Sequence, residues 1–239
     1  MESNFESNEN YNKEESLKKA ISENSLEIGI DLLEVWLDDL LKTSINETLN
    51  DIPIIKTIYS SIKTCVSIRD HIFIDKLIRF VAGYKQIDEV LRKKIQESSL
   101  DKKAKKELIQ KVIIAIERLD EIKKADALFK NFIAYTAGEI NQSEFNSFCH
   151  ALDKINYDDI AKLREFYLSR DRQEKPPIIK AGELEDPSLQ SFAFLGLIQL
   201  RPMGGVFTIG REDSSLYLTN DRGRCFLEVL GLIAKNETE

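Results

Sequence analysis

The stretch DKKAKKELIQKVIIAIERLDEI, residues 101–122, decides the fold class of the chain. Its first half is rich in lysine, and its second half places apolar residues three and four positions apart, which is the period of one helix face. This apolar stripe consists of Leu108, Val112, Ala115, Ile116 and Leu119. The pattern predicts a long amphipathic helix that begins after Ser99 or Asp101.

Two further helices are expected on the N-terminal side of this stretch. Residues 25–44, SLEIGIDLLEVWLDDLLKTS, place leucines and isoleucines on one face and four acidic residues opposite, so they predict an acidic amphipathic helix. Pro53 is suited to the first turn of a helix that runs from about residue 52 to Gly83. This second segment, in contrast, is both apolar and basic.

The helical pattern continues on the C-terminal side. Asn141 followed by Glu144 predicts a capping box at the start of a helix, and residues 123–140 predict another helix that ends at Gly138. We expect about eight helices and no strand before residue 170. The body of the protein is therefore predicted to be all-α.

Past residue 171 the pattern changes. Residues 172–186 contain Pro176, Pro177 and Gly182, which is typical of a linker. Beyond it we expect a short helix leading into a strand, a hairpin around 211–213 and a closing helix. The predicted organisation is thus a mainly α protein with a disordered acidic tail (1–13), a helical bundle (14–171), a linker (172–186) and a small α+β domain (187–239).

Composition is that of a helical protein without an extracellular disulfide framework. Of the 239 residues, 42% are hydrophobic and 31% charged. Cys65, Cys149 and Cys225 are far apart and odd in number, so we expect free thiols rather than disulfides or a zinc site. The first residues lack the basic and apolar regions of a secretion signal, and we expect a cytoplasmic protein.

Charge is distributed unevenly along the chain. Residues 1–52 hold 4 basic and 13 acidic side chains, whereas residues 53–111 hold 14 basic and 7 acidic ones, within a net charge of -7. The asymmetry indicates that the acidic segment folds over the basic one, or that the basic one meets an anionic partner.

The C-terminal residues resemble a known fold family. The order FLGLI (194–198), GGVFTIG (204–210) and LYLTNDRGRCFLEVL (216–230) is similar to the second half of a winged-helix domain, with a helix before the wing, two wing strands and a closing helix. Residues 52–77 and 124–145 resemble a set of uncharacterised bacterial helical proteins, and proteins of this design can be encoded near phage-defence genes. The resemblance implies a winged-helix-like tail and a possible role as a phage-defence effector.

The basic and apolar segment is a candidate for contact with anionic lipid. An amphipathic helix with a cationic face can lie on such a surface or line a pore, although the stretch is too short and too charged for a constitutive span. The alternative is an ordinary helix of the bundle with solvated lysines. The candidate membrane-contacting residues are Lys56, Ile58, Ile62, Lys63, Arg69, Lys76 and Arg79.

A second set of basic residues is a candidate for binding nucleic acid or a nucleotide. The alternative is a solvated helix face. The helix expected before the wing, PSLQSFAFLGL (187–197), contains neither Lys nor Arg, which weighs against sequence-specific DNA binding by that helix. The candidates for anion contact are Arg92, Lys93, Lys94, Lys102, Lys103, Lys105, Lys106, Arg211, Arg222 and Arg224.

No pattern in the chain predicts catalysis, a metal site or a cofactor. His150 follows Cys149 directly, and adjacent residues of a helix point about 100° apart, so they make a poor nucleophile and base pair. The sequence favours a non-enzymatic effector that is homo-oligomeric, controlled by a ligand or partner, and able to move from the cytoplasm to the inner membrane. The alternatives are a winged-helix regulator that binds nucleic acid, and an adaptor with neither activity.

Overall fold

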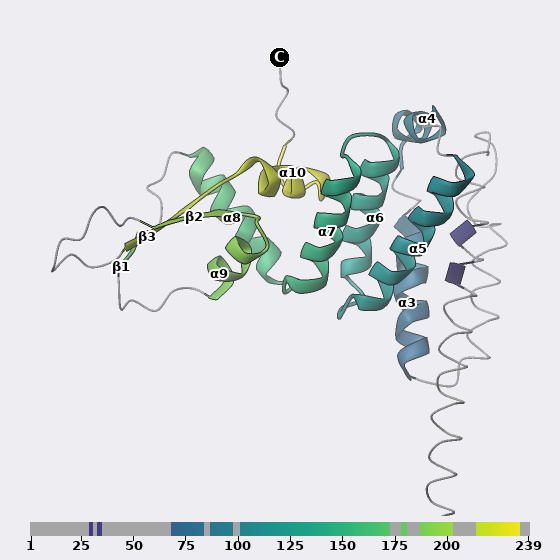
Figure 1. Ribbon diagram of the computed structural model, residues 1–239, viewed down its shortest axis with the longest axis horizontal. Helices are drawn as coiled ribbons and strands as arrows, with labels where there is room; N and C mark the ends of the chain where they lie inside the picture. Colours follow the sequence, from purple (N-terminus) through teal and green to yellow (C-terminus); the bar gives the residue numbers. More distant parts are fainter. Residues whose placement is uncertain are drawn as a thin grey trace, which may run out of the picture. The chain divides into compact units, whose positions relative to one another are not determined.

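The computed structural model describes residues 29–30, 33–34, 68–83, 87–97, 101–172, 178–180, 187–202 and 214–234 (Figure 1). The predicted acidic tail and the first part of the helix expected from residue 52 lie outside these ranges. The statements below concern the described residues.

Helices dominate this part of the chain. The described helices are α3 (Ile68–Ala82), α4 (Glu89–Glu97), α5 (Lys102–Arg118), α6 (Lys124–Thr136), α7 (Gln142–Lys154), α8 (Asp159–Asp171), α9 (Pro187–Phe194) and α10 (Asp221–Val229). The strands are β1 (Ile178–Lys180), β2 (Gln199–Pro202) and β3 (Ser214–Leu218). The prediction of a mainly helical protein is confirmed.

The chain divides into two compact units. Unit 1 comprises residues 1–129 and 136–138, and unit 2 comprises residues 130–135 and 139–239, so that α6 contributes to both. The sequence places the division at the linker 172–186 instead. Helix α7 belongs with the tail because Phe148 packs against Phe226 of α10. Helix α8 belongs there because Tyr167 bonds to Leu197 and to Asn220, the residue that caps α10, and the local sequence pattern does not reveal these contacts.

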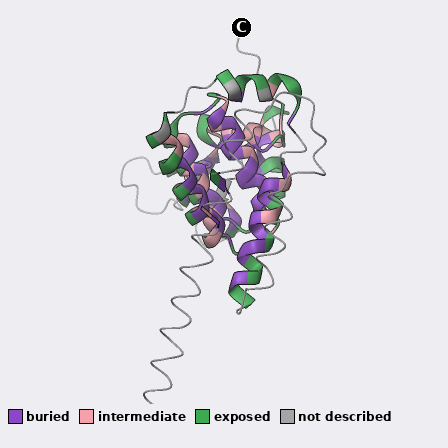
Figure 2. Ribbon diagram, turned by 90° about the vertical axis from the view of Figure 1, so that its right-hand side faces the viewer, coloured by how far each residue is buried: buried purple, intermediate pink, exposed green. Residues whose placement is uncertain are grey.

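Unit 1 is held together by the apolar faces of α3 and α5. On α3 the buried residues recur with the helical period, and α5 presents the stripe expected from the sequence. Figure 2 shows this alternation of buried and exposed residues around the helices. The buried apolar side chains of α3 are Phe73, Ile74, Leu77, Phe80 and Val81, and those of α5 are Leu108, Ile109, Val112, Ile113 and Ile116.

The helix ends follow the predicted caps. The side chain of Asp101 accepts a hydrogen bond from the backbone N–H of Ala104 at 2.7 Å. At the start of α7 the backbone N–H of Asn141 donates to the Glu144 carboxylate at 2.8 Å, and Asn141 Oδ1 accepts from the N–H of Glu144 at 3.0 Å. The capping box is therefore confirmed, because both reciprocal bonds are present.

Unit 2 contains a three-stranded antiparallel sheet in the order β1-β3-β2. Strand β2 pairs with β3 so that Leu200 lies opposite Tyr217, and the segment between them, which includes the hairpin expected around 211–213, is outside the described residues. Strand β1 pairs with the other side of β3. It lies within residues 172–186, so part of the predicted linker belongs to the sheet.

The core of unit 2 joins α7 and α10. The rings of Phe148 and Phe226 meet edge to face with centroids 5.3 Å apart. Gly223, in the first turn of α10, is packed so closely that an added Cβ would come within 1.8 Å of the Leu197 carbonyl oxygen and 2.2 Å of the Tyr167 hydroxyl. Only glycine fits at this position, which lets α10 approach the chain between α9 and β2.

Candidate functional site

The basic residues predicted on α3 are engaged with the rest of unit 1. Lys76 is buried, and its ammonium group donates to the backbone carbonyl of Leu119 and, at 3.4 Å, to that of Glu117. These carbonyls lie at the C-terminal end of α5, where a cation is favourable. Burial lowers the pKa of Lys76 below its usual value, although the nearby carboxylates of Asp120 and Glu117 act in the opposite direction.

This position corrects one expectation from the sequence. Lys76 was predicted on an exposed cationic face, because polar residues of a helix usually face solvent. It instead caps another helix, and its contact with lipid would require α3 to leave α5.

The other two predicted residues of α3 form ion pairs. Arg69 pairs with Glu117 of α5, and Arg79 pairs with Asp126 of α6 through Nε at 2.8 Å and Nη2 at 2.6 Å. Because these arginines are partly or largely exposed, each pair contributes on the order of 0–1 kcal/mol to stability. The two pairs orient α3 on its neighbours.

A second buried lysine lies at the turn between α5 and α6. Lys124 has 0% of its side chain exposed, and its Nζ lies 2.6 Å from the Asp120 carboxylate. Burial alone would raise the pKa of Asp120, but the hydrogen bond and charge of Lys124 outweigh it and hold that pKa below its usual value. The sequence analysis did not single out this pair.

The start of α3 exposes apolar side chains to solvent. Ile68 is 80% exposed and Ile72 is 40% exposed, and they lie one helical turn apart on the same side. Between them Arg69 is also largely exposed. This end of α3 therefore presents apolar surface beside the Arg69–Glu117 ion pair. Lys56, Ile58, Ile62 and Lys63, the other predicted membrane residues, lie outside the described residues.

The lysines of α4 and α5 are placed at the surface of unit 1. Lys93, Lys94, Lys103 and Lys106 are exposed and Lys105 is half-buried. Nothing is described of the side chains of Arg92 and Lys102. Burial lowers the pKa of Lys105, and the negative charge of Glu34, which lies near this part of α5, acts to raise it.

Residues of the acidic segment are packed against α3 and α5. Gly29, Ile30, Leu33 and Glu34 are helical, and both Gly29 and Leu33 are buried. A Cβ added at Gly29 would lie 3.1 Å from Ile113 Cδ1 and 3.1 Å from Phe73 Cζ. The acidic segment was predicted to cover the basic residues 53–81, and in the described part it touches both α3 and α5.

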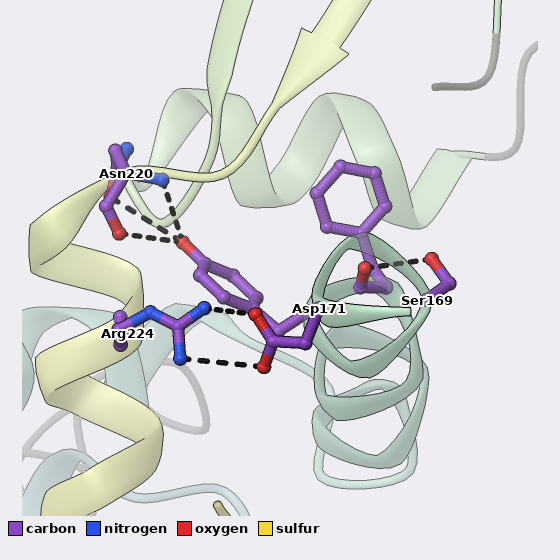
Figure 3. Close-up of polar contacts among 6 residues, drawn as sticks. Ser169, Asp171, Asn220 and Arg224 are labelled. Atoms are coloured by element: carbon purple, nitrogen blue, oxygen red, sulfur yellow. Dashed lines mark hydrogen bonds and ion pairs between the residues drawn. The ribbon is translucent and has the colours of Figure 1, made fainter. Parts of the chain in front are cut away.

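Unit 2 contains a polar cluster centred on Tyr167 of α8, which the sequence analysis missed. Its hydroxyl group donates to the Leu197 carbonyl at 2.6 Å and accepts from the N–H of Asn220 at 3.1 Å. Asn220 in turn caps α10 by accepting from the N–H of Gly223 at 2.7 Å. Figure 3 shows Arg224 paired with Asp171 next to this cluster, and Asn220 on the side away from Asp171. No local signal marks the tyrosine, since its partners are up to 53 positions away.

The predicted arginines of the tail have separate environments. Arg224 forms an ion pair with Asp171, and the hydrogen bond from that pair raises the pKa of the guanidinium above its ordinary value. Arg222 is exposed, and so is Arg201 on β2. Arg211 lies outside the described residues. Within unit 2, the described arginines of the tail therefore differ in environment: Arg224 is in an ion pair, and Arg201 and Arg222 are exposed.

Within the described ranges, no group of three or more His, Cys, Asp or Glu side chains is placed to hold a metal ion. None of the helices described has the length and apolar character that crossing a bilayer requires. His71 and His150 are both exposed.

Comparison of the chain with protein-family models, with curated proteins and with solved structures gives no match.

The Tyr167 cluster yields a prediction about alkaline stability. Burial raises the pKa of Tyr167 to about 12. Because the unfolded chain ionises this group near pH 10, the folded state retains a proton that the unfolded state loses, and stability falls as the pH rises from about 10 to about 12. Tyr167→Phe is expected to lose about 1–3 kcal/mol at pH 7, since the Leu197 carbonyl remains buried without its donor.

Chemical denaturation of both proteins at pH 7 and at pH 10–11 measures these effects. The loss of stability with pH should be smaller in Tyr167→Phe than in the wild type. Equal losses in the two proteins would show that Tyr167 does not titrate in this range upon unfolding.

Proposed function

We propose that the chain is a non-enzymatic effector that contacts anionic membranes through residues 52–72, with the rest of α3 as the anchor that ties this segment to unit 1. The observation that carries the proposal is the exposed start of α3, where Ile68 and Ile72 present apolar surface beside the Arg69–Glu117 ion pair. The preceding residues of the sequence add the cations Lys56 and Lys63. A cationic and apolar helix face is the combination that binds the interface of an anionic bilayer.

The contacts of α3 differ between its first turn and the rest of the helix. Lys76 and Arg79 are engaged by α5 and α6, and Arg69 pairs with Glu117 of α5. The apolar side chains of Ile68 and Ile72, in contrast, are exposed. The residues of 52–67 continue the apolar and basic pattern of this exposed end in the sequence. The interface would therefore be reached without removing α3 from the core of unit 1.

The wider proposal follows the resemblance to bacterial proteins encoded near phage-defence genes. A ligand or partner bound by the rest of the chain would control the protein, which would act as a homo-oligomer and move from the cytoplasm to the inner membrane on activation. Assembly of several copies would multiply a weak contact per chain into stable membrane binding.

Dye release from vesicles of phosphatidylglycerol and phosphatidylcholine tests this function. We expect that Ile68→Ser with Ile72→Ser lowers membrane affinity about tenfold or more, because two apolar side chains are no longer buried in the bilayer interface. The protein concentration that gives half-maximal dye release should rise by the same factor. Lys56→Glu with Lys63→Glu should have a similar effect if the same face extends to residue 52.

Val90→Ser with Ile114→Ser is the matched control, because both residues are exposed apolar side chains elsewhere in unit 1. It should leave dye release unchanged. Equal losses in the two double variants, or no release by the wild type at any lipid composition, would contradict the proposal.

A winged-helix regulator that binds nucleic acid is the second candidate. It is supported by a helix that leads into a small antiparallel sheet, α9 followed by β2 and β3, and by the exposed Arg201 and Arg222 in the same unit. Helix α9 contains neither Lys nor Arg. In this candidate function, contacts with DNA phosphates would therefore come from Arg201 and Arg222.

Gel retardation of duplex DNA at several salt concentrations tests the second candidate. Replacement of both arginines, Arg201→Gln with Arg222→Gln, removes two phosphate contacts. The negative slope of log affinity against log salt concentration should therefore become shallower by about two. Lys123→Gln with Arg118→Gln removes the same charge from exposed positions of unit 1 and should not change the slope. Absence of DNA binding, or equal effects of the two pairs, would exclude phosphate contacts through this surface.

A further inference from the structure

The side chain of Asn131 joins α6 to α7 inside unit 2. Asn131 has no exposed surface, and its Nδ2 donates to the Phe145 carbonyl oxygen at 3.2 Å. The same nitrogen lies 3.4 Å from Sγ of Cys149, one turn further along α7. Because a carbonyl only accepts hydrogen bonds, the contact with Phe145 fixes the amide with its N–H groups towards α7.

The oxygen of this amide is unsatisfied. Asn131 Oδ1 is buried and has no hydrogen-bond partner. A buried acceptor without a donor lowers stability, and an apolar side chain at this position would avoid that loss. The acceptor therefore indicates a donor that arrives in another state of the site.

Cys149 is the reactive group beside this amide. It is a free cysteine whose side chain is half-buried, so a small oxidant can reach it. An N–H group that points at sulfur favours the thiolate, which is the nucleophilic form of cysteine. Asp153, one turn away on the same helix, opposes a second negative charge, but its carboxylate is paired with Lys154 at 3.0 Å.

From this geometry we propose that Cys149 is a site of reversible oxidation by hydroperoxides, and that Asn131 is its positioning residue. The Cys149 thiolate attacks one oxygen of the peroxide, so that an S–O bond forms while the O–O bond breaks. The sulfur loses two electrons and the peroxide gains them. Together with the proton of the thiol, the second oxygen leaves as water or, from an organic peroxide, as an alcohol. The product is a sulfenic acid.

This product completes the hydrogen bonds of the amide. A sulfenic acid carries an O–H group on the sulfur that Asn131 already contacts. Oδ1 belongs to the same amide and supplies the acceptor that this O–H group requires. A reducing thiol restores Cys149 through a mixed disulfide. The inference concerns unit 2 and does not depend on membrane contact by residues 52–72.

Mass spectrometry of peptides from the full-length protein tests the site. The protein is treated with hydrogen peroxide and with dimedone, which traps sulfenic acids, and the labelling rate is measured for each cysteine. Cys225 of α10 is the internal reference, because it is also a free and half-buried cysteine. Cys149 should be labelled at least about fivefold faster, since a hydrogen bond stabilises its thiolate. Equal rates would overturn the proposal and leave the Asn131 acceptor as a site for buried water only.

The variant Asn131→Ala separates positioning from packing. It should lower the labelling rate of Cys149 to that of Cys225, and it should shift the half-maximal alkylation of Cys149 by iodoacetamide to a higher pH. A purely structural effect would instead raise the rate, because a loosened core exposes the thiol. Faster labelling, or an unchanged pH profile, would refute the role of Asn131.

Tyr167→Phe is the matched control, because it also removes a buried polar group from unit 2 but acts on α8. It should leave the rate and the pH profile of Cys149 unchanged. Equal effects of the two variants would assign the change to a general loss of stability and contradict the proposal. If circular dichroism shows that Asn131→Ala unfolds, the comparison of Cys149 with Cys225 in the wild type decides alone.

Discussion

The packing of α3 on α5 is the constraint on which the account of unit 1 depends. Burial of a leucine or phenylalanine side chain contributes about 1.5–3 kcal/mol, and Leu77 and Phe80 have no exposed surface at all. Lys76 adds a directional contact, because its ammonium group reaches the last carbonyls of α5. With α3 held in this way, the exposure of Ile68 and the ion pairs of Arg69 and Arg79 follow from their positions on the helix.

Unit 2 depends on a different interaction, the hydrogen bonds of the Tyr167 hydroxyl group. Tyr167 reaches from α8 to the carbonyl of Leu197 and to Asn220, the residue that caps α10. Close packing at Gly223 lets α10 approach the same point. The tail is therefore built on α8, and the side chains of Arg201, Arg222 and Phe194 (84% exposed) remain at the surface.

Local features were predictable from the sequence, and long-range ones were not. The apolar stripe of α5 and the capping box at Asn141 depend on residues within one or two turns, and both were predicted. The contact between Lys76 and Leu119 spans 43 positions, so helical periodicity could place the lysine only on a polar face. Strand β1 was missed because three residues are too few to show the alternation of a strand. Of the candidate site, charge patterning predicted that the acidic segment folds over residues 53–81, but it did not predict that Gly29 lies beside Phe73 of α3 and Ile113 of α5.

Hydrogen exchange of the α3 amides, with and without phosphatidylglycerol vesicles, tests the central claim most directly. If α3 is a core helix and residues 52–72 make the membrane contact, the amides of 73–82 exchange as slowly as those of α5 in both conditions, because both then exchange through the same opening of unit 1. Changes on addition of vesicles should be confined to residues before Phe73. Faster exchange along the whole of α3 than along α5, or loss of its protection on vesicles, would contradict the account and show that α3 itself leaves the core.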